Sequence, residues 1–388
     1  MIKRNLYIFK LYYFFWRFKP LAALMIIYFT QITKSYSSAM GIFAIFNISY
    51  AFAKIPSGLI SDKLGRKPVL IAANIITSSA FILLSLAGQF EIKYFLYLFA
   101  FMWGTGEALS AGTVDALMYE TATNLKQSNY FKSIYAKSMY YEQLGCALGA
   151  ICAMFVTYSL PLQFVAWISI LPPLTLLIVA CFFVEPKIKR KNTTINKNDI
   201  ITASKQFIKN KTLTFYTLSD IYFSTLGDIS HRFESAYFKL FTSDWIISLA
   251  KVLKHLFGML GFAFVPFIKY LSNSKIYFGS ISCNILIRTI AVIANNIYTP
   301  FIHMFINFFY ATASTARTDI LQHEFLPQYR ATTQSIIQFI KGLYMSTITY
   351  LLGIVADLYG IYVAMLSLIV LRIIGLCIVH TVQHFYKI

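Results

Sequence analysis

One short stretch decides the fold: Gly58-Leu59-Ile60-Ser61-Asp62-Lys63-Leu64-Gly65-Arg66-Lys67-Pro68. It places a charged turn between two apolar segments, at approximately 39–60 and 69–88. A helix of roughly 20 mostly apolar residues is long enough to cross the hydrocarbon core of a bilayer. The stretch therefore predicts a loop that joins two membrane-spanning helices.

The residue types within this loop have clear physical uses. Gly58 permits close approach of helices, and Gly65 permits a tight turn that other residues resist. Asp62 can pair with a cationic group or accept a hydrogen bond at a helix N-terminus. Arg66 and Lys67 are expected at the level of the cytoplasmic headgroups.

The same alternation of apolar segments and polar turns continues over the whole chain of 388 residues. The other apolar segments lie at approximately 8–32, 93–113, 134–158, 162–184, 213–236, 246–268, 277–297, 299–318, 332–355 and 360–381. Hydrophobic residues make up 58% of the chain and charged residues only 13%, about half the share in soluble domains. This composition excludes an ordinary soluble protein and a disordered one, and it predicts an all-α polytopic membrane protein with twelve spanning helices.

The charges of the chain indicate its topology. Lys and Arg number 34 against 15 Asp and Glu, a formal net charge of +19. The basic residues collect in alternate loops, chiefly in the loop at Lys63–Lys67 and between residues 185 and 211. Such an alternation predicts that both termini are cytoplasmic, and it disfavours a nucleic-acid-binding surface, since the basic clusters lie between spans.

A polar segment divides the twelve predicted spans into six and six. We expect an N-terminal half at 1–184, a basic cytoplasmic linker at 185–211 and a C-terminal half at 212–388. The first span is too long for a signal peptide and is read as a retained helix. The five cysteines lie inside predicted spans with no close Cys/His spacing, so neither a disulfide framework nor a metal site is expected.

The loop matches the pattern G-x-x-x-D-[RK]-x-G-[RK]-[RK], and the chain resembles the major facilitator superfamily over its full length. The resemblance implies a twelve-helix fold in two six-helix halves. It also implies that Gly58, Asp62, Gly65, Arg66 and Lys67 form a conformational latch that does not touch substrate. In that fold spans one, four, seven and ten line the central cavity.

The fourth span resembles that of a subgroup of bacterial facilitators. It contains Gly104-Thr105-Gly106-Glu107-Ala108 and then Asp115-Ala116-Leu117-Met118-Tyr119-Glu120. Small residues at Gly104, Ala108 and Gly112 give one face for close helix contact. Many drug/proton antiporters carry an arginine where this chain has Ala100, and a Gly-Pro motif in span five where this chain has Gly145-Cys146-Ala147-Leu148-Gly149-Ala150. Both differences weaken the case for antiport.

Ionisable groups inside the spans are the candidate functional residues, because each costs about 2.5–3.5 kcal/mol on insertion scales. Within the cavity-lining spans the candidates for substrate or proton coupling are Arg17, Glu107, Asp220 and Asp228. Other charges within spans are Lys19, Glu142, Lys254, Arg288, Lys341 and Arg372. Arg288 and Arg372 are expected to be paired or to extend toward the interface.

We hypothesise that Glu107 or Asp228 carries a coupling proton, with Arg17 as counter-charge or anion contact. A carboxyl group in a low-dielectric cavity suits that task. The alternative is a set of fixed structural ion pairs; Asp228 and Arg232, four residues apart, could neutralise each other.

The sequence thus indicates a secondary transporter of the bacterial inner membrane, a monomer that moves a small organic solute with protons by alternating access. Export is the first expectation, and uptake by symport is the alternative. No phosphate-binding G-x-x-x-x-G-K-[ST] loop is present. No catalytic residues, cofactor or metal are expected, and a receptor-like paralogue without transport is the alternative of another class.

Overall fold

The computed structural model describes residues 2–125, 131–186, 207, 209–268, 270–325 and 330–386. Over these residues the regular secondary structure is helical and includes no strand, which confirms the all-α fold class. The chain forms two compact units, Met1–Lys34 with Ser38–Ile195 and Ser35–Ser37 with Asn196–Ile388. Most of the expected linker at 185–211 lies outside the described residues, as do Lys126, Lys269 and Lys387.

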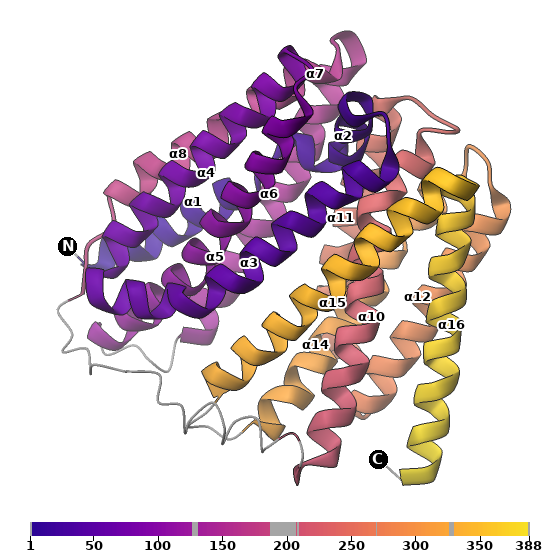
Figure 1. Cartoon of the computed structure of the whole chain (residues 1–388). Coiled ribbons are helices and arrows are strands. Elements are labelled where there is room, and N and C mark those ends of the chain that lie inside the picture. Colours follow the sequence, from indigo (N-terminus) through magenta and orange to yellow (C-terminus); the bar gives the residue numbers. More distant parts are fainter. Residues whose placement is uncertain are drawn as a thin grey trace. The chain divides into compact units, whose positions relative to one another are not determined.

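The first unit is built from long helices with short connections. In chain order these are η1 (Ile2–Arg4), α1 (Asn5–Arg17), η2 (Pro20–Ala23), α2 (Met25–Thr33), α3 (Tyr36–Leu64, whose first two residues group with the other unit), α4 (Arg66–Gln89), α5 (Lys93–Asn124), α6 (Phe131–Ser159), α7 (Leu162–Ile168) and α8 (Leu171–Cys181). Helix α4 packs against α5 and α8, and α1 packs against α6 and α8 (Figure 1). Phe9, Tyr12, Leu117 and Phe183 are buried in their shared core.

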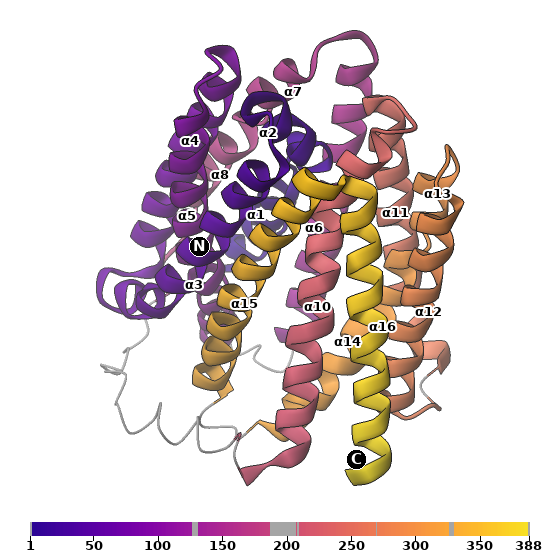
Figure 2. The ribbon, with the colours of Figure 1, turned by 45° about the vertical axis from the view of Figure 1, so that its right-hand side comes forward.

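The second unit repeats this architecture. Its elements are α10 (Lys211–Phe238), α11 (Asp244–Phe264), η4 (Val265–Ile268), α12 (Asn273–Ala294), α13 (Thr299–His303), α14 (Ile306–Glu324), α15 (Arg330–Tyr359) and α16 (Ile361–Tyr386). Helices α10, α15 and α16 contact one another, and α14 packs against α11 and α12 (Figure 2).

Each of the twelve predicted spans coincides with one helix or a broken pair of helices, and the breaks have local causes. The first span is interrupted where Pro20, which lacks an N–H and disfavours a helical conformation in the residue before it, follows Lys19. The sixth span is interrupted before Pro172 and Pro173, which occupy the first turn of α8. The tenth is divided into α13 and α14.

Eight of the described helices are long and apolar enough to cross a membrane. They correspond to the second, third, fifth, sixth, eighth, ninth, eleventh and twelfth predicted spans. The other four are the first, fourth, seventh and tenth spans. Two of these are broken into short helices, and the helices of all four carry ionisable side chains such as Glu107 and Asp228. Among the described helices, every third span is therefore less apolar or shorter than the others.

Close packing between α6 and the break in the first span depends on glycine. A Cβ atom added at Gly145 would lie 2.2 Å from the backbone oxygen of Phe14, and one at Gly149 would lie 3.1 Å from the backbone nitrogen of Lys19. Gly104 is similarly tight, since its added Cβ would lie 2.5 Å from the backbone oxygen of Phe46 on α3. This confirms the close helix contact that the sequence predicts at Gly104.

The Gly145→Ala variant should be strongly destabilised. Because the obstructing atom belongs to backbone, the helices must separate, at a cost of about 3 kcal/mol. Gly279→Ala is the matched control, since its added Cβ meets no atom within 4 Å and alanine is the better helix former by up to about 1 kcal/mol. Thermal unfolding in detergent should show a lower midpoint for the first variant and an equal or higher midpoint for the second. Equal midpoints for both variants would contradict the close packing.

Candidate functional site: buried charges at a broken helix

The first candidate site lies where the first span is broken. Helix α1 ends at Arg17, and Lys19 has an extended backbone with φ −122° and ψ 90° before Pro20 begins η2. The last carbonyl groups of a helix carry partial negative charge, which favours cations such as Arg17 and Lys19 beside them. Broken helices that expose such ends near the midplane are a recurring element of transporter binding sites.

Glu107 of α5 is the centre of this site. Its carboxylate forms an ion pair with the ammonium group of Lys19, and the two side chains are only 11% and 10% exposed. Trp16 donates its indole N–H to Oε2 over 2.7 Å, and Trp103 donates its own to Oε1 over 3.0 Å. The Lys19 ammonium also lies 5.1 Å from the centre of the Trp103 ring. We call these four residues the Lys19–Glu107 site.

A second ion pair adjoins this site. Arg17 donates from Nε to Glu142 Oε1 of α6 over 2.7 Å, and its side chain is 48% exposed. The sequence hypothesis gave Arg17 as counter-charge or anion contact of the proton carrier; the direct partner of Glu107 is Lys19, and Arg17 pairs with Glu142. The difference arises because Lys19 lies beyond the helix end, where its extended backbone redirects the side chain.

Two buried tyrosines of α1 form further polar contacts within the first unit. The Tyr13 hydroxyl donates to Asp115 of α5. The Tyr12 hydroxyl lies 3.3 Å from Asn74 Oδ1 and 3.4 Å from Ser110 Oγ. In sequence these tyrosines belong to an aromatic run that is explained equally well by helix packing.

In the second unit, the two predicted aspartates of α10 each have a cation from another helix. Asp228 accepts from Lys341 Nζ of α15 over 3.0 Å. Asp220 accepts from Arg317 Nη1 of α14 over 2.8 Å.

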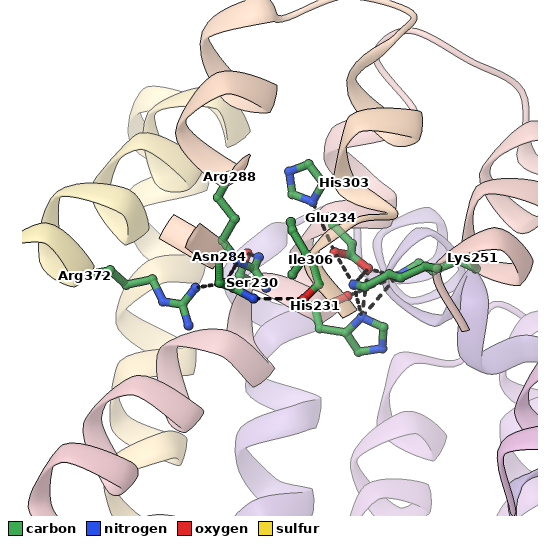
Figure 3. A network of polar contacts seen from close by, with 10 residues as sticks. Ser230, His231, Glu234, Lys251, Asn284, Arg288, His303, Ile306 and Arg372 are labelled. Carbon is green, nitrogen blue, oxygen red and sulfur yellow. Dashed lines mark hydrogen bonds and ion pairs between the residues drawn. The ribbon is translucent and has the colours of Figure 1, made fainter. Parts of the chain in front are cut away.

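A denser cluster surrounds Glu234, near the C-terminal end of α10 (Figure 3). Lys254 lies 2.6 and 2.8 Å from the two carboxylate oxygens, and Lys251 also pairs with Oε1. His231 Nδ1 lies 2.8 Å from Oε1 and His303 Nδ1 lies 3.5 Å from Oε2. Glu234, both lysines and His303 are buried. We call these five residues the Glu234 cluster.

The loop between α3 and α4 forms a network of its own. Gly65 has a left-handed φ of +97°, as a tight turn requires. Arg66 pairs with Asp62 at 2.6 Å and with Glu120 at 2.9 Å, while Glu185 accepts from the backbone nitrogens of Arg66 and Lys67 at 2.7 and 2.9 Å.

Of the expectations for this loop, one stays a prediction and one needs correction. Arg66 is only 8% exposed and is held by carboxylates, while its level relative to the headgroups stays a prediction. An added Cβ at Gly58 meets no atom within 4 Å, so Gly58 mediates no close helix contact in this structure.

Comparison with known proteins identifies the family. The model of the major facilitator superfamily matches residues 11–348, most of the chain. The chain belongs to the major facilitator superfamily. It is thus a multi-pass membrane protein of a transporter family, and the resemblance inferred from the Gly58–Pro68 stretch is confirmed.

Solved structures of other facilitators share its fold. A mutant of the nucleoside transporter NupG aligns with a TM-score of 0.82 at 14% identity, covering 98% of this chain and 99% of that one. A POT family transporter in complex with 5-aminolevulinic acid gives 0.79 at 11% identity, with 97% and 96% covered. A D-xylose-proton symporter gives 0.73 at 12% identity, with 97% and 95% covered. A comparison with curated protein sequences found no match.

The sequence of this facilitator indicates most of the charged residues within its spans but not the side chains that contact them. Trp16 and Trp103 were not singled out, although both stand within four residues of a charge in a span. The Glu234 cluster was also missed, because its members come from α10, α11 and α13. Among the described residues no group of three or more His, Cys, Asp and Glu side chains could hold a metal ion.

Replacing Arg66 should weaken the first unit of this facilitator. Arg66→Gln loses the ion pairs with Asp62 and Glu120, and we expect the free energy of unfolding to fall by about 2 kcal/mol. Arg66→Lys keeps the charge but not the forked geometry, so its loss should be intermediate. Lys63→Gln, at an exposed position of the same loop, is the control. Denaturant titrations that rank Lys63→Gln as equally damaging would contradict this role of Arg66.

Proposed function

We propose that this chain is a secondary active transporter that moves a small polar organic solute by alternating access and couples its movement to protons. Arg17, Glu107, Asp220 and Asp228 are the proposed coupling and substrate residues, now with Lys19 as the direct partner of Glu107. Rocking of two halves around a midplane site is the expected mechanism for this family.

The Lys19–Glu107 site is the observation that carries the proposal. Burying two charges costs several kcal/mol each before their attraction is counted, and an apolar pair of similar volume would serve stability equally well. The pair also lies at the break of the first span and joins it to α5. The first and fourth spans are two of the four whose described helices are too short or too polar to count as apolar spanning helices. Charged groups buried within a membrane-spanning segment are best explained by a role in binding or moving the transported solute or proton.

The chemistry of the site favours a polar solute. Two indole N–H groups and a lysine–carboxylate pair offer donors and an acceptor in a fixed arrangement. The Arg17 guanidinium beside them is half-exposed and could meet an incoming carboxylate or phosphate. A lipophilic drug would form no hydrogen bonds with these groups, whereas a polar solute can exchange hydrogen bonds with them.

Export is the direction that we propose first, with uptake by symport as the second candidate. Two sequence positions favour the second candidate. Ala100 replaces the arginine of many drug/proton antiporters, and the Gly145–Ala150 segment lacks the proline of their fifth span.

We further propose a topology of two halves, 1–184 and 212–388, joined by a basic linker at 185–211. Both termini would then be cytoplasmic in the bacterial inner membrane, with the transporter acting as a monomer. The excess of Lys and Arg in alternate loops supports this orientation.

Stability screening followed by flux measurement tests the function. Purified full-length protein is heated with pools of nucleosides, amino acids, sugars, organic acids and drugs at two pH values, since a ligand that binds the folded state raises the unfolding midpoint. The stabilising solute is then assayed in proteoliposomes with an internal pH dye. Coupled solute and proton movement supports the proposal, and its direction relative to the proton gradient separates export from symport.

Two outcomes would contradict it. Solute flux that does not depend on the proton gradient would contradict the proposed coupling to protons. Binding without any flux in sealed proteoliposomes would instead favour a receptor-like protein.

A further inference from the structure

A small, partly open cavity lies within the second unit. It has a volume of about 50 Å³ and is lined by residues of α10, α12, α14 and α16. A water molecule accounts for about 30 Å³ of the liquid, whereas pockets for organic ligands measure at least about 300 Å³. The cavity therefore has room for a monatomic or small polyatomic ion but not for an organic solute.

The charges around this cavity are unbalanced. Arg317 and Arg372 line it together with one carboxylate, Asp220, which Arg317 already engages at 2.8 Å. Arg288 adds a further positive charge behind Asn284. Within the described part of the chain, neither Arg288 nor Arg372 has a carboxylate at ion-pair distance.

The nearest other carboxylates are already held by cations. Asp228 is held by Lys341, and Glu234 is held by Lys251 and Lys254. The surroundings of Arg372 thus retain an excess of positive charge.

The hydrogen-bond partners of the two buried arginines, Arg288 and Arg372, are neutral groups. Figure 3 shows Arg288 and Arg372 reaching toward Asn284 from two different helices. Asn284 Oδ1 accepts from Arg288 Nε at 2.9 Å and from Arg372 Nη1 at 3.0 Å. Arg372 also donates to the backbone oxygen of Phe223 at 3.0 Å, and Arg288 donates to Ser230. Buried charges without a counter-ion are expensive, so this arrangement calls for an anion.

Three donors at the cavity are left unused. Arg372 Nε, the Tyr277 hydroxyl and Ser224 Oγ are all buried and have no hydrogen-bond partner, and all three residues line the cavity. Arg372 and Tyr277 are more than nine-tenths buried. Buried polar groups are satisfied in the great majority of cases. Three orphaned donors beside an uncompensated guanidinium suit one small anion as a common acceptor.

We propose that this cavity binds a small monovalent anion such as chloride, held by Arg372 Nε, the Tyr277 hydroxyl and Ser224 Oγ. The anion would neutralise the excess charge of Arg372 and Arg288 and stabilise the packing of α10, α12, α14 and α16. Asp220, one of the proposed coupling residues, lines the same pocket, so the anion would bind beside it and add a role that the proposed function does not include. Gly227 supports it, because a Cβ there would lie 3.2 Å from Arg372 Nη2 and disturb the guanidinium.

Binding of radioactive chloride to the purified full-length protein in chloride-free gluconate buffer tests the proposal. We expect saturable binding that bromide and nitrate displace and that gluconate, which exceeds the cavity, does not. Unfolding midpoints at constant ionic strength should rise with chloride in the same concentration range. Absence of saturable binding to the wild-type protein, with the cavity then holding water only, would overturn the site.

Two variants place the binding at this cavity. Tyr277→Phe keeps the ring and removes one donor to a charged ligand, so the dissociation constant should rise about tenfold. Tyr298→Phe, at an exposed position, should leave the constant unchanged. Arg372→Gln should abolish binding and make the unfolding midpoint independent of chloride. Unchanged chloride affinity in a folded Tyr277→Phe protein would show that the anion binds elsewhere.

Discussion

Replacing Glu107 by glutamine should abolish proton-driven accumulation of the solute while exchange of solute across the membrane continues. A gradient of one pH unit supplies about 1.4 kcal/mol per proton, which corresponds to a concentration ratio of about ten for one proton per solute. Without a group that binds the proton this ratio should fall to about one. Glutamine keeps the shape of glutamate, and its single amide oxygen can still accept from one of the two indoles, so most of the local packing should survive.

The measurement compares two fluxes in the same proteoliposomes. Accumulation is followed after a pH gradient is imposed, and exchange is followed with equal pH on both sides. Glu91→Gln is the matched control, because Glu91 lies exposed between α4 and α5 and its loss should leave both fluxes intact. A Glu107→Gln protein that still accumulates solute tenfold would mean that the Lys19–Glu107 pair is only a structural ion pair.

Truncation of Glu234 should be the most damaging single change in the second unit. Glu234→Ala leaves Lys251 and Lys254 buried without their shared carboxylate, and removal of one partner from a buried ion pair typically costs about 3–5 kcal/mol. The expected result is a large fall in the unfolding midpoint in detergent, together with poor yield of folded protein.

Removing the lysines at the same time should restore much of that stability. The triple variant Glu234→Leu, Lys251→Met and Lys254→Met replaces the buried charges by apolar groups, a change that is often neutral or stabilising. Glu324→Ala is the control variant, because it also removes a carboxylate close to the C-terminal end of a helix. The cluster is not a coupled buried unit if Glu234→Ala unfolds at the wild-type midpoint, or if the triple variant is no more stable than Glu234→Ala.

The fold of this facilitator could be predicted from sequence because it follows from quantities that are local in the chain. Apolar segments long enough for a bilayer, the charged loop around Asp62 and the distribution of Lys and Arg depend on composition and spacing alone. The break of the first span was not predicted, although Pro20 follows two charges within an apolar segment.

The candidate sites could be predicted only as a set of residues. Glu107 and Asp228 stood out because a charge inside a span is costly, but sequence spacing ranks partners on the same helix above those on other helices. It therefore suggested Arg232 for Asp228 and could not reveal the ion pair of Asp228 with Lys341 of α15.

Clusters assembled from several helices leave no pattern in the sequence. The members of the Glu234 cluster stand 17 to 23 residues apart between α10 and α11, with no recognisable spacing. The cavity beside Arg372 likewise depends on how four helices pack, which periodicity and spacing in the sequence do not determine.

The proton stoichiometry of solute binding tests the central claim most directly. Purified protein in weakly buffered solution is mixed with the solute found by screening, and an indicator dye reports the protons taken up or released. If solute and proton binding are linked through Glu107, the wild-type protein should exchange about one proton per solute and Glu107→Gln should exchange none. The same proton exchange in both proteins would contradict the account.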